Sequence, residues 1–194
     1  MKTGRRTDEM KQNNKGFSLV ELIVTILIVA IIAGGAVVSF NVVYNANTDR
    51  AAKRLIAALN ETREQAMVGE DDSTYYLKLY ATTDGYKADI CLNSDATVIA
   101  EKEIGNKRVS IDVAKKNGVD NTPVALGEDC EIVSFVFDKK RGALARTTLL
   151  KTDGTVTAST SGENDMYIDV NVTGSITNEV IIVPATGRSY IYKD

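Results

Sequence analysis

The chain has 194 residues, of which 44% are hydrophobic and 25% are charged, a composition typical of a globular domain. It contains no histidine, which excludes a histidine-based catalytic triad or histidine metal site on this chain. Its formal net charge of −3 argues against a generally basic surface for nucleic acid.

The charge is distributed unevenly along the chain. Residues 1–16 carry five basic residues and two acidic ones, a net charge of +3. Residues 17–194 must then carry −6 for the whole chain to reach −3. A basic stub that precedes an apolar run and an acidic body indicates export, with the stub left inside the cell.

The apolar run predicts a membrane helix over residues 17–40. No residue from Leu22 to Phe40 is charged, and these 19 residues approach the ~20 that a helix needs to cross a bilayer. A single-span anchor fits this run, and so does a cleavable secretory signal that ends near Gly34 and Ala36. Neither explains Glu21, a carboxylate inside the run that costs at least ~2.5 kcal/mol in lipid.

The stretch GFSLVE at residues 16–21, behind its basic leader, resembles the start of type IV pilins and pseudopilins. The resemblance implies that residues 1–16 are a prepilin leader, which a prepilin peptidase removes by cutting between Gly16 and Phe17. It implies that Phe17 is then N-methylated, and that Glu21 meets the Phe17 amine of a neighbouring subunit. Because a misregistered subunit would leave both charges unpaired in a low dielectric, Glu21 is expected to guide assembly.

Residues 41–69 are predicted to continue the helix outside the membrane as an amphipathic second half. One face carries residues at helical spacing that suit packing on a sheet: Ala51, Leu55, Leu59, Thr62 and Ala66. Gly69 is a suitable stop after Val68. The expected shape is a lollipop, with the first half of the helix in the membrane or filament core and the second half under a head.

Residues 70–194 are predicted to form an antiparallel β head, which makes the fold class α+β. Alternating apolar and polar residues predict strands at 75–80, 86–92, 97–104, 107–113, 131–138, 142–150, 155–160, 166–172, 179–183 and 188–192. Short turns such as Asp84-Gly85 and Asp153-Gly154 favour antiparallel pairing, and a loop is expected over 114–129.

Several features of the head resemble minor subunits of the family, the H-type pseudopilins and T-type fimbrial pilins. They are the Leu55, Leu59, Arg63, Ala66 spacing, the run VSFVFDKKRGAL at 133–144 and the ending EVIIVPATGRSYIY at 179–192. Thr186-Gly187-Arg188 matches the turn between the final strands of such subunits.

Cys91 and Cys130 lie beyond the apolar run, and spacing leaves open whether they form one disulfide or remain free thiols. The acidic loops 70–72 and 163–165 lack the spacing of an EF-hand, so no metal site is predicted. No nucleophile stands at a recognisable spacing from a base, so neither an enzyme nor a cofactor is predicted.

The predicted function is a structural and assembly subunit of a type IV pilus or type II secretion pseudopilus. The resemblance implies as partners the prepilin peptidase, other pilin subunits, an inner-membrane assembly platform and, through residues 17–40, lipid. It also implies a single-pass precursor in the plasma (inner) membrane, with the leader cytoplasmic and the head outside, which later enters the filament.

An alternative is a DNA-binding minor pilin of a transformation pilus. Lys139-Lys140-Arg141, Arg146 and Lys151 could contact DNA phosphates, although a solvated hairpin turn explains them more simply. Some T-type relatives end in a Gly-Arg-x-Arg tail linked to DNA binding. Gly187-Arg188-Ser189-Tyr190 lacks the second arginine, which weighs against that role.

Overall fold

The computed structural model describes residues 17–69, 73–93, 95–115, 122–160 and 167–192; of residues 36–44, 160 and 167 it describes the backbone alone. The chain divides into two compact units, one ending at Phe40 and the other beginning at Asn41. A helix, α1 (Leu19–Val68), contributes its first half to one unit and its second half to the other.

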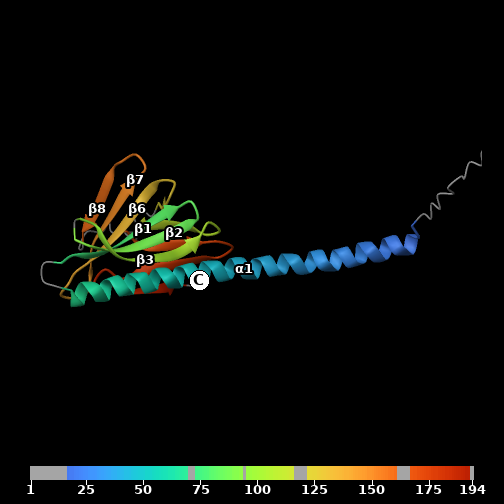
Figure 1. Ribbon diagram of the computed structural model, residues 1–194, viewed down its shortest axis with the longest axis horizontal. Helices are drawn as coiled ribbons and strands as arrows, with labels where there is room; N and C mark the ends of the chain where they lie inside the picture. The colour runs from blue at the N-terminus through green and yellow to red at the C-terminus, as the bar shows by residue number, and fades with distance from the viewer. Residues whose placement is uncertain (1–16, 70–72, 94, 116–121, 161–166, 193–194) are drawn as a thin grey trace, which may run out of the picture. The chain divides into compact units, whose positions relative to one another are not determined.

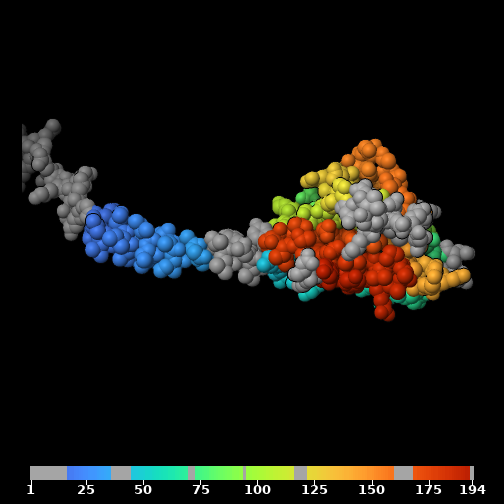
Figure 2. Space-filling model, turned by 180° about the vertical axis from the view of Figure 1, so that it is seen from behind, coloured from blue at the N-terminus to red at the C-terminus, as the bar shows by residue number. Residues whose placement is uncertain are grey.

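The described part of the head forms two antiparallel sheets (Figure 1). The first, sheet A, has the strand order β3-β2-β1-β6-β7-β8, and the second, sheet B, has the order β11-β10-β9-β4-β5. Figure 2 shows β10 and β11 in red on the opposite side of the head from the labelled strands of sheet A. The strands are β1 (Tyr75–Thr82), β2 (Gly85–Leu92), β3 (Thr97–Asn106), β4 (Ser110–Lys115), β5 (Val124–Ala125), β6 (Cys130–Phe137), β7 (Leu144–Lys151), β8 (Val156–Thr160), β9 (Tyr167–Thr173), β10 (Thr177–Ile182) and β11 (Ser189–Tyr192).

The α+β class and the ten predicted strands are confirmed, with strand ends that differ by at most three residues. The predicted loop over 114–129 is partly wrong, because it contains the short strand β5, which pairs with β4. Two residues are too few to show an alternating pattern, so the sequence gives no period-2 signal for β5.

The core lies between the two sheets and the second half of α1. The five helix residues predicted to face a sheet are all buried, and Leu55, Leu59 and Thr62 are completely so. Leu77, Leu79 and Phe135 meet this face from sheet A, and Val170 and Val180 belong to the same cluster from sheet B. The second half of α1 therefore completes a core that neither sheet closes alone.

Polar contacts attach α1 to both sheets. On one side, Glu61 pairs with Lys102 of β3 at 2.9 Å, beside the edge of sheet A. On the other, the Asn178 amide of β10 donates to the Asp49 carboxylate at 2.8 Å.

Arg63 joins α1 to two turns that are far apart in the sequence. Its Nε lies 3.1 Å from the carbonyl oxygen of Gly142, after β6, and 2.9 Å from that of Thr186, after β10. The second turn approaches the first so closely that a side chain on Gly187 would overlap the Gly142 carbonyl oxygen. Gly187 also has a φ of +64°, a left-handed conformation that favours glycine.

Replacing Gly187 should therefore destabilise the head more than replacing a glycine that has a left-handed backbone conformation but no close neighbour. Gly154 is the matched control, because its φ is +81° and nothing lies within 4 Å of an added methyl group. We expect Gly154→Ala to cost about 1 kcal/mol of unfolding free energy. Gly187→Ala should cost on the order of 3 kcal/mol or more, since the turn must also move away from Arg63. Thermal unfolding of the full chain in detergent measures both, and equal costs would contradict the close approach.

Candidate functional site at the start of the long helix

Ser18 and Glu21 set the start of α1. The backbone N–H of Val20 donates to the Ser18 Oγ at 3.3 Å, and the N–H of Leu22 donates to the Ser18 carbonyl at 3.1 Å. Ser18 is therefore the N-cap, and Glu21 follows at the spacing of a capping box. Glu21 lies in the first turn, where the helix dipole favours a negative charge.

The capping role of Ser18 is a functional feature that the sequence prediction missed. The signal was present, since serine followed three residues later by glutamate before an apolar run is a helix-start pattern. Its effect is to fix the helix start two residues after Phe17.

The predicted processing and assembly residues lie together around this helix start. Gly16 lies outside the described residues. Phe17 directly precedes the cap, and its side chain is 83% exposed. Glu21 is also exposed, and its carboxylate has no hydrogen bond or ion pair with any residue that the structure describes. One chain, in its described ranges, thus leaves this carboxylate available to a group from another molecule.

The first half of α1 exposes apolar side chains all around the helix. Figure 2 shows one side of this segment, residues 17–35, in blue. The large exposed apolar side chains are Leu19, Val20, Leu22, Ile23, Val24, Ile26, Leu27, Ile28, Val29, Ile31 and Ile32. A helix that is apolar on every side is characteristic of a protein core or a lipid environment, not of a water-facing surface.

A search of the described residues finds no helix with both the length and the apolarity needed to cross a membrane. Residues 36–40 of the predicted span 17–40 have side chains outside the described set.

Comparison with known protein families identifies this segment. Residues 11–37 match the prokaryotic N-terminal methylation motif. This is the signature of type IV pilins and pseudopilins. No curated protein and no solved structure matches the chain. The motif supports a type IV pilin-like or pseudopilin subunit, and it implies processing by a prepilin peptidase and assembly with other pilin subunits.

The disulfide that the sequence left open is not formed. Cys91 and Cys130 are both free and buried. Cys91 of β2 pairs with Tyr76 of β1, and β1 separates β2 from β6, where Cys130 begins the strand. Two strand spacings already amount to ~9.5 Å, beyond the ~7 Å limit between the Cα atoms of a disulfide.

The basic cluster predicted at 139–151 is divided by the hairpin. Lys139, Lys140 and Arg141 occupy the turn after β6, and Arg146 follows early in β7. Lys151 pairs with Cys130 at the opposite end of the hairpin, roughly 20 Å away along the strand. Arg141 also has an acidic neighbour, with its Nε 3.6 Å from Asp138.

The acidic loops 70–72 and 163–165 lie outside the described residues. Among the residues that the structure does describe, no group of three or more Cys, Asp or Glu side chains is placed to hold a metal ion.

The two thiols should be present and unreactive in the folded protein. Burial raises the pKa of both Cys91 and Cys130 above the usual thiol value, so little reactive thiolate forms at pH 8. We expect a thiol reagent to find no accessible group in the native chain and two groups after denaturation without reductant. Lys140→Cys, on an exposed turn, should react at once in the native state. Finding no thiol after denaturation would show a bridge.

Proposed function

We propose that the protein is a minor structural subunit of a type IV pilus or type II secretion pseudopilus, and not a catalyst. The observation that carries the proposal is the exposed Glu21 carboxylate at the start of an apolar helix, inside a matched N-terminal methylation motif. The assignment to the minor subunits rests on the resemblance of the second helix half and of the turn at Thr186-Gly187-Arg188. The DNA-binding alternative is not favoured, since the hairpin separates Lys151 from the other basic residues and Arg141 lies beside Asp138.

The proposed precursor enters the plasma (inner) membrane through residues 17–40, with the leader cytoplasmic and the head outside. A prepilin peptidase removes residues 1–16, and Phe17 becomes the N-methylated first residue of the mature chain. The subunit then leaves the lipid for a filament, with an inner-membrane assembly platform as its partner. Helix–helix packing in the filament covers the apolar side chains that the single chain exposes.

Glu21 favours transfer of the subunit from lipid into the filament in a single register. In lipid an unpaired carboxylate is costly, by at least ~2.5 kcal/mol on insertion scales. In the filament it meets the positive amine of Phe17 from a neighbouring subunit, at the positive end of that subunit's helix dipole. A shifted subunit would leave both charges unpaired in an apolar surrounding, so the pair favours one register.

Cleavage should depend on Gly16. A peptidase must bring its catalytic groups close to the extended backbone, and a branched side chain at this position obstructs that approach. Gly16→Val should therefore leave a full-length precursor in the membrane, whereas Gly34→Ala, within the helix, should be processed normally. Mass spectrometry of the native protein should find methylated Phe17 as the first residue. A mature terminus near Val37 would instead show a secretory signal.

Glu21 should be dispensable for cleavage and necessary for assembly. Glu21→Leu removes a charge that lipid disfavours, and Glu21→Gln keeps the size of the side chain but removes the charge. Both variants should be cleaved but should lose incorporation by tenfold or more, because a neighbour's Phe17 amine is left unpaired. Thr25→Val is the control, since the Thr25 hydroxyl donates to the Leu22 carbonyl of its own helix and to no other described residue.

The measurement is the amount of mature subunit in the sheared extracellular fraction, compared with the mature subunit in the membrane. Normal incorporation of both Glu21 variants would contradict the proposed contact and would leave a membrane-anchored β domain of another role.

A further inference from the structure

Three basic residues form an exposed strip on the second half of α1. Arg50, Lys53 and Arg54, called here the basic strip, lie within one helical turn, on the side opposite the buried Ala51 and Leu55. Like charges at these spacings repel each other. None of the three forms an ion pair or hydrogen bond with the described residues, whereas Glu61 of the same helix is paired with Lys102.

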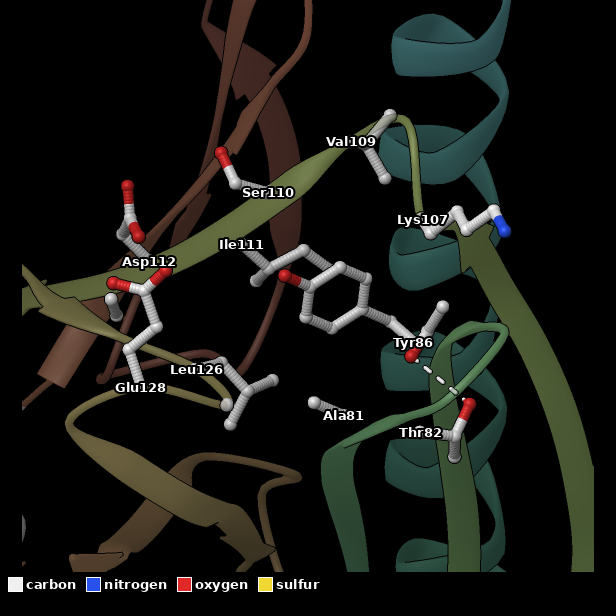
Figure 3. Close-up of a pocket in the computed structure, with 13 residues that line it drawn as sticks. Ala81, Thr82, Tyr86, Lys107, Val109, Ser110, Ile111, Asp112, Leu126 and Glu128 are labelled. Atoms are coloured by element: carbon white, nitrogen blue, oxygen red, sulfur yellow. Dashed lines mark hydrogen bonds between the residues drawn. The ribbon is translucent and has the colours of Figure 1, made fainter. Parts of the chain in front are cut away.

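A cavity of about 430 Å³ opens between the two sheets, at the end of the β1–β2 hairpin. Figure 3 shows the Tyr86 ring in its centre, between Ile111 of β4 and Ala81 of β1, with Leu126 nearby. The carboxylates of Asp112 and Glu128 lie together at one end, and Lys107 lies at the other. Asp112 and Glu128 are called here the acidic rim.

Within the described residues, the acidic rim carries negative charge that no cation pairs with. Neither Asp112 nor Glu128 has a hydrogen bond or ion pair within the described part of the chain. Burial, then the charges of Glu128 and Asp129, raise the pKa of the Asp112 carboxyl. Asp129 is itself held by the backbone N–H of Ala125, at 3.3 Å. A cation placed at the rim would relieve this repulsion, and the aromatic and aliphatic floor suits the stem of a long basic side chain.

We infer that the basic strip of one copy of this chain docks against the acidic rim of a second copy. The two surfaces have opposite charge, and each is uncompensated within the described residues of its own chain. The strip spans about 6 Å along the helix axis, which suits a pair of neighbouring carboxylates. Arginine guanidinium groups fit carboxylates in a bidentate geometry.

A single chain cannot make this contact with itself. The strip lies on the face of α1 that points away from the sheets, while the rim belongs to the sheets that cover the other face. The two surfaces differ, so the contact is heterologous and can repeat from copy to copy without closing, as a filament requires. The inference rests on the proposed function and names a second subunit contact, separate from the one at Glu21.

Crosslinking between two tagged full-length copies in the native cell tests the inference. One copy carries Arg54→Cys and the other carries Glu128→Cys; the native cysteines are buried. We expect a mixed disulfide dimer at least tenfold above that of a control pair, Lys140→Cys with Glu128→Cys. Lys140 is equally exposed and basic but lies outside the strip. A mixed dimer no more abundant than that of the control pair would overturn the inference.

Charge exchange provides an independent readout. Arg54→Glu and Glu128→Arg should each lower incorporation into the sheared fraction by about threefold, and the double variant should restore it. The rescue separates a contact between the two residues from separate effects on folding. If the double variant is no better than Arg54→Glu, and Arg54→Glu also weakens retention in vesicles containing anionic lipid, the strip binds lipid headgroups and the inference is wrong.

Failure of this inference is distinguishable from failure of the proposed function. If Phe17 is methylated and the Glu21 variants lose incorporation, but no mixed dimer forms, the inference alone is overturned. If Phe17 is unmodified and the Glu21 variants behave normally, the proposed function itself is overturned.

Discussion

One arginine connects the three parts of the head. Leu55 and Leu59 are completely buried on one face of α1, and Arg63 follows one turn later. Its guanidinium donates to two carbonyl groups, one after β6 in sheet A and one after β10 in sheet B. The two carbonyl oxygens share the single N–H of Arg63 Nε, and a hydrogen bond from a charged donor is worth about 1.5–3 kcal/mol. This shared bond links both sheets to one helix.

Because both sheets close on one face of α1, the opposite face of the same helix is available for other contacts. The second half of α1 therefore combines a stripe of buried residues with the exposed Arg50, Lys53 and Arg54. The first half differs, since its apolar side chains surround the helix on all sides. The sequence shows this change, from apolar residues on all sides of the first half of α1 to apolar residues on one side of the second half. The change separates the segment suited to an apolar environment from the segment that completes the core of the head.

Local sequence patterns predicted most of this structure. The features that depend on the pairing of distant segments could not be predicted from the sequence. Alternation gave the strands, and helical spacing gave the buried positions of α1, because both depend on neighbours within a few residues. The insertion of β1 between β2 and β6 depends on long-range pairing, so the separation of Cys91 from Cys130 could not be read from their spacing. The same holds for Arg63, whose acceptors at Gly142 and Thr186 lie 79 and 123 residues away.

The candidate site shows the same division between local and distant information. The cap at Ser18 and the position of Glu21 depend only on neighbouring residues, and both residues lie within the matched motif. The acidic rim is not local, since Asp112 follows the β3–β4 turn and Glu128 follows β5. Both Glu21 and the acidic rim are charges that the described residues of a single chain leave uncompensated, and in the proposed filament both are paired. An unpaired charge costs little in water, as at the acidic rim, but much in lipid or in a protein interface. Assembly would therefore favour the one arrangement in which every such charge meets its counterpart.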